Sequence, residues 1–494
     1  MSDLIRVLNE TPLAESTANV AEVWQGLGSL QFDMALEVPV GDRAGEEVLV
    51  EVAAAFDEVE LQMPEFDLQF DDLQGMAGYS TAQGLHSSGF TGRSFDRPIA
   101  GSIATVIDNP GSEISVTIDG AIAATALFEW SDQLLLSRST GELSYNAVVH
   151  IPFGDETKEP YVEASSDLTG VSLNLPYPLD KLNAEDSRKF RYRQHFSNDS
   201  YRVDVMVDDD LKASLRIEEG IAVGGLVHFG QEPLASVDYD RIRMTGHLDY
   251  LDVQRWLQVI DELGEVSDVA LNDEIAAHLE SAELSVEKLL FYDLELPSTG
   301  VRVVRNQCAW VTSLDNAMLK GEVIVADADD VPVEIMLEQL QLDNSDDASD
   351  SLGDVNPSEI DDINFSTDSL MINGEDYGSW AFNFRVEDQV ARFEDIDATP
   401  AGLRVLPSSI VEWRVAEGIH STSYIGDIEV DDLALVMSKY GFASSVEGQG
   451  LKIDANVSWS GSPAMIDVER IVGQVGIRSE EHTSELQSPD HLVC

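Results

Sequence analysis

The chain has 494 residues, and 43% of them are hydrophobic, which is typical of a folded protein and excludes a largely disordered one. Its 92 acidic and 29 basic residues give a formal net charge of −63, which would repel nucleic-acid phosphates, so we expect no nucleic-acid partner. The length predicts two or three domains, or one elongated architecture, rather than a single compact core. We interpret the acidity as a solvated outer surface.

The N-terminal segment, residues 2–30, is expected to begin as a helix and to continue as a loop. Leu4, Ile5 and Leu8 lie on one face at helical spacing. The segment lacks the basic and apolar regions of a signal peptide. No run of about 18 apolar residues occurs, and a membrane-spanning helix needs such a run. We therefore expect neither a signal peptide nor a transmembrane segment in this chain.

From residue 31 to residue 245 the sequence reads as successive β-strands separated by turn residues. Within each predicted strand apolar and polar side chains alternate, as they do in a strand with one apolar face and one polar face. The alternation is clear over 48–56, 113–119 and 201–207. This pattern predicts a mainly β fold, built as a long antiparallel sheet that is apolar on one face only.

Three segments have helical periodicity. Residues 252–263 are expected to form a helix capped by Asp252, and residues 272–281 a second helix capped by Asn272. Residues 431–440 are expected to form a third helix, which Gly441 ends. The apolar stripes of the first and third helices consist of Val253, Trp256, Leu257 and Ile260, and of Leu433, Val436, Met437 and Tyr440.

We expect two β-groove segments, 1–245 and 284–477, to flank a helical insertion at 246–283. The second β segment contains an acidic, serine-rich stretch at 343–362 that predicts a loop or linker. Near its end, residues 451–459 alternate without a break and predict the most regular strand of the chain.

The last stretch, 478–494, breaks the alternating pattern and resembles the translation of a sequencing adapter. We interpret it as an artefact that packs against nothing, and we expect the genuine chain to end near Ile477. Cys494 is then excluded, and Cys308 is expected to be a buried small hydrophobic residue. With no anchor at the other end either, we expect a fragment of a longer protein.

Motifs for catalysis or cofactor binding are missing from the sequence. It has no G-x-S-x-G nucleophile motif and no glycine-rich phosphate loop. No histidines before residue 478 are paired at metal-ligand spacing, and we expect His228 and His247 to have structural or surface roles. We therefore expect no enzyme activity, no cofactor and no metal. A hydrolase that uses acidic residues is the least favoured hypothesis.

Several stretches carry a more specific pattern. They are PEFDLQFDDLQG at 64–75, YSTAQG at 79–84, FTGRSFDRP at 90–98, LNLPYPLDK at 173–181, LMINGEDYG at 370–378, 432–441, and WSGSP at 459–463. Each stretch alone is weak, but their combination over nearly all of 1–477 is fairly specific. Together they resemble the YhdP family of AsmA-like proteins.

This resemblance implies a large envelope protein of Gram-negative bacteria, tethered to the inner membrane by an N-terminal helix and extending across the periplasm. The family resembles the bridge-like lipid-transfer proteins, in which a long curled β-sheet encloses an elongated apolar groove. The implied function is to conduct phospholipid towards the outer membrane. The implied partners are phospholipid acyl chains, the inner membrane through a helix that this chain lacks, and outer-membrane components.

The resemblance also makes the apolar face of the strands the candidate site. Without it, alternating residues would predict a packed β core more readily than a groove, so a structural envelope protein with a fully packed core remains the alternative. We expect the groove residues to line one continuous concave surface. The candidates are Val48, Val50, Val52, Ile114, Val116, Ile118, Val203, Val205, Trp380, Phe382, Phe384, Leu451, Ile453, Val457 and Trp459.

Overall fold

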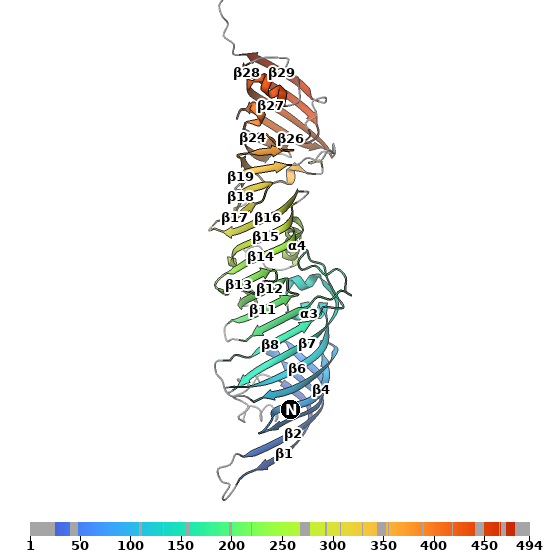
Figure 1. Ribbon diagram of the computed structural model, residues 1–494. Coiled ribbons are helices and arrows are strands. Elements are labelled where there is room, and N and C mark those ends of the chain that lie inside the picture. Colours follow the sequence, from blue (N-terminus) through green and yellow to red (C-terminus); the bar gives the residue numbers. More distant parts are fainter. Residues whose placement is uncertain are drawn as a thin grey trace, which may run out of the picture. The chain divides into compact units, whose positions relative to one another are not determined.

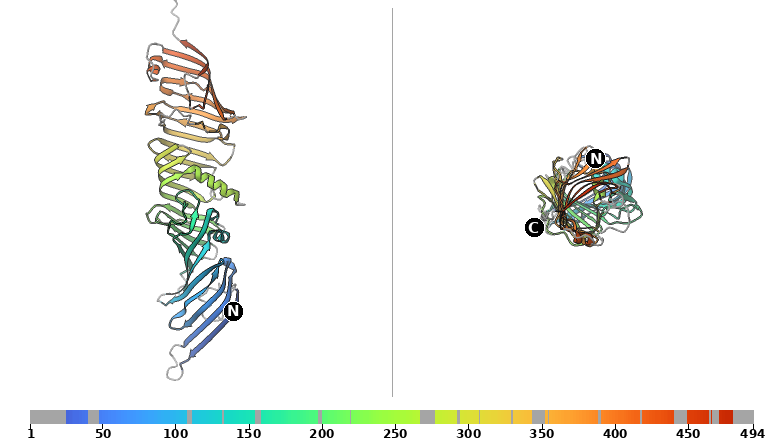
Figure 2. Two further views of the ribbon diagram at one scale, coloured as in Figure 1. Left: turned by 90° about the vertical axis from the view of Figure 1, so that its right-hand side faces the viewer. Right: turned by 90° about the horizontal axis from the view of Figure 1, so that it is seen from above.

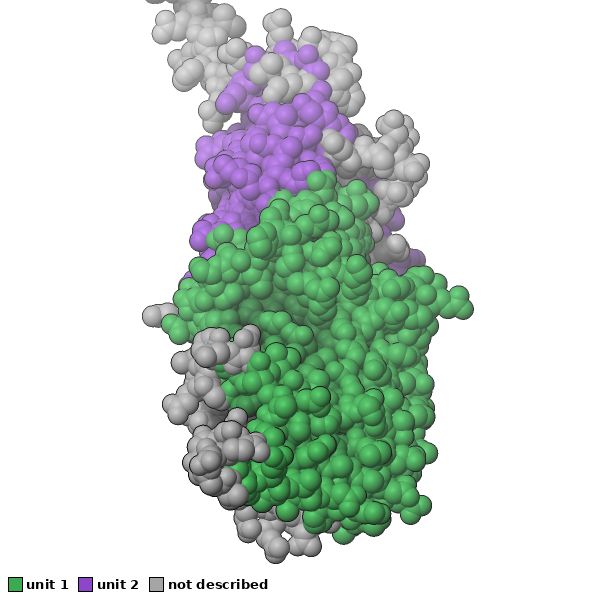
Figure 3. All heavy atoms as spheres, turned by 60° about the horizontal axis from the view of Figure 1, so that its bottom comes forward, with its two compact units in different colours: residues 1–295 green, residues 296–494 purple. Residues whose placement is uncertain are grey.

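The computed structural model describes most of the chain, and it separates into two compact units, Met1–Glu295 and Leu296–Cys494 (Figure 3). The described residues are 25–39, 48–107, 111–131, 133–153, 158–196, 200–218, 220–266, 277–291, 294–306, 308–328, 330–342, 352–353, 355–387, 390–416, 418–439, 449–463, 465 and 471–479.

The first unit is built mainly from strands (Figure 1). They are β1 (Gln25–Glu37), β2 (Leu49–Met63), β3 (Leu68–Ser80), β4 (Gly84–Ser94), β5 (Arg97–Val106), β6 (Ser112–Ala123), β7 (Ser139–Phe153), β8 (Tyr161–Ser166), β9 (Val171–Leu173), β10 (Phe190–His195), β11 (Tyr201–Val207), β12 (Leu211–Glu218), β13 (Ile221–Phe229), β14 (Ile242–Asp252) and β15 (Leu279–Phe291).

Short helices connect some of these strands. They are the 3-10 turns η3 (Pro64–Phe66) and η4 (Leu134–Arg138) and the helices α3 (Ala124–Ser131) and α4 (Val253–Val266). Helix α3 lies between β6 and β7 and contacts both, and α4 contacts β15 (Figure 2). Asp252 caps α4, because its Oδ1 accepts a hydrogen bond from the backbone N–H of Arg255 at 2.9 Å.

The sheet of the first unit is antiparallel from β1 to β13, in chain order except that β8 pairs directly with β10. Strands β13, β14 and β15 then pair in parallel. The predicted mainly β fold with a long sheet is confirmed, but the sheet is mixed here and not antiparallel throughout. Parallel neighbours need a crossover connection, and residues 230–241 and the segment that begins with α4 supply the two crossovers.

The second unit is also mainly β. Its strands are β16 (Leu294–Arg305), which begins at the unit boundary, β17 (Ala309–Asp315), β18 (Leu319–Ala326), β19 (Val333–Leu342), β20 (Ile363–Thr367), β21 (Leu370–Ile372), β22 (Glu375–Asp376), β23 (Trp380–Glu387), β24 (Val390–Ala398), β25 (Leu403–Val405), β26 (Ile410–Ala416), β27 (Ile419–Asp432), β28 (Gln449–Ser460) and β29 (Val472–Ser479).

The second unit contains the 3-10 turns η5 (Pro357–Glu359) and η6 (Pro400–Gly402) and the helix α6 (Leu433–Lys439). Its strands pair antiparallel except where β19 runs parallel to β20 and β21. The chain crosses over between β19 and β20, and η5 lies in that connection. Both units are therefore mixed sheets with few helices.

The predicted helices agree with the structure only in part. The prediction for 252–263 is confirmed by α4, and α6 lies within the predicted range 431–440. The prediction for 272–281 is wrong at its end, since β15 begins at Leu279. The predicted N-terminal segment is wrong over 25–30, where β1 pairs with β2. At 279–281 sheet pairing prevails over a weak helical period, and at 25–30 it takes the place of the expected loop. Residues 1–24 and 267–276 lie outside the described part.

Two further expectations are corrected. Cys308 is a free, exposed cysteine and not a buried one, because it lies at the turn before β17 rather than within a strand. Arg478 and Ser479 belong to β29 and pair with Lys452 and Leu451 of β28, so the ordered strand extends beyond Ile477. Residues 480–494 lie outside the described part of the chain.

Candidate functional site

One face of the first unit carries an unbroken row of uncharged side chains, because directly paired residues of neighbouring strands point to the same side of a sheet. We call this side the inner face. The row crosses every strand from β1 to β15 except β9. It consists of Leu30, Phe56, Gly75, Phe90, Gly101, Ile118, Ala147, Ala164, Tyr192, Val205, Ala213, Val227, Met244 and Ala282.

The candidate residues of the first unit lie on this inner face. Ile118 and Val205 belong to the row itself. Residues at even spacing on one strand point to the same face. On β6 this places Ile114 and Val116 with Ile118, and on β11 it places Val203 with Val205. On β2 it places Val50 and Val52 with Phe56. Ile114 and Val203 are buried and the others half-buried. Val48 precedes β2 and is 42% exposed.

The second unit has a corresponding inner face. One register row runs through Val301, Leu314, Gly321, Leu337, Thr367, Trp380, Ala398, Val405, Ile428, Ile453 and Ile477. A second runs through Ile363, Phe384, Phe393, Val411, Tyr424, Val457 and Gly473. Trp380, Phe393 and Val411 pack in one cluster, so the two rows share a face.

All candidates of the second unit therefore point to one side. Phe382 lies between Trp380 and Phe384 on β23, and Leu451 and Trp459 flank Ile453 and Val457 on β28 at even spacing. Phe384, Leu451 and Trp459 are buried, whereas Trp380, Phe382, Ile453 and Val457 are half-buried. The structure thus brings the candidates of each unit together on that unit's inner face.

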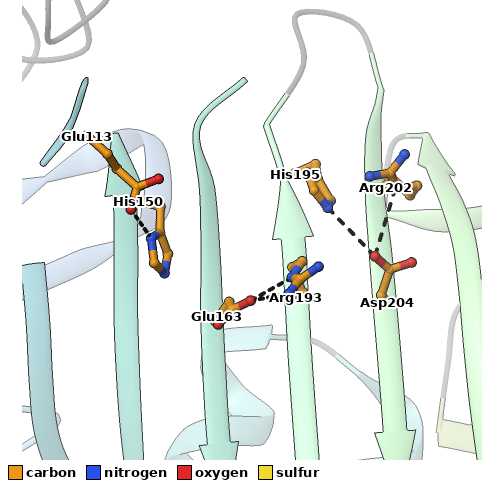
Figure 4. A network of polar contacts seen from close by, with 7 residues as sticks. All are labelled: Glu113, His150, Glu163, Arg193, His195, Arg202 and Asp204. Atoms are coloured by element: carbon orange, nitrogen blue, oxygen red, sulfur yellow. Dashed lines mark hydrogen bonds and ion pairs between the residues drawn. The ribbon is translucent and has the colours of Figure 1, made fainter. Parts of the chain in front are cut away.

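The opposite, outer face of the same strands is polar and charged, as Figure 4 shows for β6 to β11. Its register row passes through Ser115, His150, Tyr161, His195 and Arg202. The rings of His150 and Tyr161 stack with centroids 4.3 Å apart, and those of Tyr161 and His195 are 5.5 Å apart. Charged groups therefore gather on the outer face, one residue away from the uncharged inner row.

Opposite charges are paired along this outer row. His150 Nδ1 lies 2.8 Å from a Glu113 carboxylate oxygen, and Arg193 Nε donates to Glu163 at 2.7 Å (Figure 4). Asp204 lies 3.7 Å from His195 Nε2. Burial and then the charge of Arg202 lower the pKa of His195, so its neutral form is favoured at neutral pH.

Three tyrosines, Tyr145, Tyr192 and Tyr201, lie on the inner face of the first unit. Burial raises the pKa of Tyr145, of Tyr192 and of Tyr201, so their phenols stay neutral across the physiological range. Tyr192 also donates its hydroxyl hydrogen to Gln194 Oε1 at 2.7 Å, which satisfies a polar group on an apolar surface.

The inner faces are covered to different degrees. In the first unit Phe32, Met34 and Leu36 of β1 are 61%, 67% and 58% exposed, and they pair with inner residues of β2. In the second unit Leu352, Val355 and Ile360, from the crossover before β20, pack on Phe384, Ala391 and Trp413. Helix α6 similarly packs through Val436 on Val430 and Leu451.

A cover also exists in the first unit, near β14. Val259 and Leu263 of α4 pack with Leu175, and Trp256 donates its indole N–H to the Tyr177 carbonyl at 3.0 Å. The Tyr177 ring meets the ring of Tyr250 on β14 edge-on, with centroids 6.4 Å apart. The LNLPYPLDK stretch therefore joins α4 to the sheet.

Other possible sites are weaker. An open hollow of about 850 Å³ in the first unit is lined partly by Gln74, Thr91, Ala100 and Asp119, a register row of the outer face. Among the described residues, no three His, Cys, Asp or Glu side chains are grouped so that they could hold a metal ion. Within the same described part, no helix is long and apolar enough to cross a membrane.

Comparison with protein families shows that the chain matches the model described as YhdP protein over residues 1–487. The chain belongs to the YhdP family. The match includes both inner faces and every candidate residue, and it ends ten residues beyond Ile477. Comparisons with curated proteins and with solved structures found no significant match. The family resemblance carried by the sequence motifs is thus confirmed.

Proposed function

We propose that the inner faces hold the acyl chains of phospholipids and that this YhdP-family chain is part of a bridge that conducts phospholipid between the inner and outer membranes. The observation that carries the proposal is the unbroken, uncharged register row across the sheet of the first unit. An acyl chain needs continuous apolar contact along its path, and one charged side chain in the row would interrupt it.

The energetics of lipid transfer fit such a surface. Each methylene moved from water to an apolar surface gains about 0.8 kcal/mol, so a phospholipid with roughly 30 methylenes costs about 24 kcal/mol to expose fully. A surface as apolar as the bilayer core makes the transfer nearly neutral. The head group remains in water at the open side, where it need not be desolvated. Movement along the surface then requires no chemical step and no cofactor.

Partial exposure supports a lipid surface over a packed core in much of the molecule. Val116, Ile118 and Val205 are half-buried although their neighbours on the same face are apolar. A residue in a closed core would be covered on all sides. Figure 3 shows a hollow in the surface of the first unit.

A structural envelope protein with a packed β core is the second candidate, and one observation favours it. Phe384, Ala391 and Trp413 are 4%, 0% and 2% exposed beneath the crossover segment, so the inner face of the second unit is closed there. On the lipid proposal this cover is local, and acyl chains pass beside it over half-buried residues such as Val457.

We place the protein in the periplasm, tethered to the inner membrane through an N-terminal helix and in contact with outer-membrane components. These placements rest on membership of the YhdP family. The proposed partners are phospholipid acyl chains, and the proposal contains no catalytic role.

The test is the amount of phospholipid that co-purifies with the chain, measured by native mass spectrometry. Val457→Asp places a carboxylate on the inner face between Tyr424 and Gly473, and we expect lipid loading to fall at least about tenfold. The matched control is Asn456→Asp on the exposed outer face, which should load as the wild type does. Equal loading of both folded variants, or a wild type without lipid, would falsify the proposal.

A further inference from the structure

Two aromatic side chains of the inner face lie over glycines of the neighbouring strand. Phe90 of β4 is paired directly with Gly101 of β5, and Tyr145 of β7 is paired directly with Gly120 of β6. A Cβ atom on Gly120 would lie 2.7 Å from Tyr145 Oη and 2.8 Å from its Cζ. A Cβ atom on Gly101 would lie 2.3 Å from Phe90 Cζ.

These distances fix the orientation of the rings. The far end of each ring occupies the place where the side chain of its register partner would stand, so each ring leans across the sheet instead of projecting from it. Aromatic rings that cover cross-strand glycines in this way also protect the backbone of those glycines. A ring that lies against the sheet adds only the thickness of one atomic layer, about 3.5–4 Å.

We propose that Gly120 and Gly101 are positioning residues that determine how far the rings of Tyr145 and Phe90 project from the inner face between β4 and β7, and therefore how much space is left there for acyl chains. Their missing Cβ atoms let Tyr145 and Phe90 form a low aromatic floor, over which acyl chains lie. The inference rests on the proposed lipid-binding function and adds the residues that keep this stretch of the path open. The rings supply apolar contact, while the glycines keep them from standing in the path.

Gly120 offers the cleaner test of the two. The three atoms nearest to its added Cβ all belong to side chains, namely two atoms of Tyr145 and, at 3.0 Å, Ile99 Cγ2. At Gly101 the added atom would also lie 2.5 Å from the backbone oxygen of Thr117, so a substitution there would strain the sheet itself. Gly120→Ala should therefore displace the end of the Tyr145 ring from its place against the sheet.

The experiment measures phospholipid loading by native mass spectrometry and the melting temperature of each variant. We expect Gly120→Ala to load at least about fivefold less lipid than the wild type. Gly120→Ala combined with Tyr145→Leu should restore loading, because the displaced ring is gone. The control is Gly89→Ala, beside Phe90, where the added Cβ has no neighbour closer than 3.8 Å and loading should not change.

The outcomes separate this inference from the proposed function. If the wild type and Gly120→Ala carry equal amounts of lipid, the inference is overturned but the proposed function is not. The same holds if the double variant carries as little lipid as Gly120→Ala. A wild type without lipid overturns the proposed function and the inference with it. If Gly120→Ala lowers the melting temperature, the lipid loading of the single variant Tyr145→Leu decides instead. Loading of that variant at or above the wild-type amount supports the low aromatic floor, and reduced loading contradicts it.

Discussion

The inner face is open at β1 and β2 of the first unit and closed at β23, β24 and β26 of the second. Phe32, Met34 and Leu36 expose more than half of their surface, whereas Ala391 and Trp413 expose 0% and 2%. Both regions follow the same period-two pattern in sequence. The difference is the crossover segment before β20, which packs on the second region and has no counterpart over β1 among the described residues. The same pattern therefore serves a surface in one place and a core in the other.

The largest expected effect is in the closed region. Trp413→Ala removes a buried indole and its hydrogen bond to His420 Nδ1, which is 3.1 Å long. We expect the free energy of unfolding of the second unit to fall by about 3–5 kcal/mol, as for other large cavities. Denaturant titration measures it. A loss below about 1 kcal/mol would mean that the crossover does not form a packed core.

A second test concerns the covered corner of the first unit. Lys181 is buried, and its Nζ donates to the backbone oxygens of Val171, Asn183 and Ala184 at 2.6, 3.0 and 3.3 Å. Lys181→Met leaves these oxygens without a donor, so we expect a loss of about 1–3 kcal/mol in stability. Lys189→Met, at an exposed position nearby, is the control and should change stability by less than about 0.5 kcal/mol. Equal effects would refute the structural role of Lys181.

The face of the sheet to which each strand residue points is predictable from sequence, whereas the segments that pack on the inner faces are not. Period-two alternation places Ile118, Val205 and Val457 on the correct face, because strand geometry alone decides this. The acidic stretch 343–362 predicts only a linker, yet its Leu352, Val355 and Ile360 close the core. These apolar residues have no regular spacing, so their role depends on tertiary contacts that a sequence pattern does not encode.

Sequence reasoning also missed that Lys181 and Lys212 are buried. Lys181 lies within the LNLPYPLDK stretch, and Lys212 lies on β12, where its Nζ donates to three backbone oxygens of residues 230–232. Lysine normally predicts an exposed position. Only the fold of the segments around each lysine brings the carbonyl groups together, and no local signal indicates this.

A smaller effect is expected on the outer face of the first unit. Because the pKa of His195 is lowered in the folded state, the unfolded chain takes up a proton first as the pH falls below about 6.5. The stabilisation is therefore present above that pH and is lost during acidification. In His195→Gln the decline in melting temperature between about pH 7.5 and about pH 5.5 should be shallower than in the wild type. A steeper decline would contradict the direction of the shift.

The smallest effect on stability is expected in the open region. Met34 of β1 is 67% exposed, so Met34→Ala should change the free energy of unfolding by less than about 0.5 kcal/mol. The same variant removes apolar surface next to Val52 and should reduce lipid loading slightly. A stability loss comparable with that of Trp413→Ala would erase the contrast between the two regions.

The most direct test of the lipid surface is photo-crosslinking at adjacent positions on opposite faces. A photoreactive amino acid at Ile118 points to the inner face, and the same amino acid at Thr117 points to the outer face. The chain is expressed in bacteria, irradiated in cells, and analysed for covalently bound phospholipid by mass spectrometry. We expect phospholipid adducts at position 118 and none above background at position 117. Adducts at neither position, or equal adducts at both, would contradict the assignment of the inner face to acyl chains.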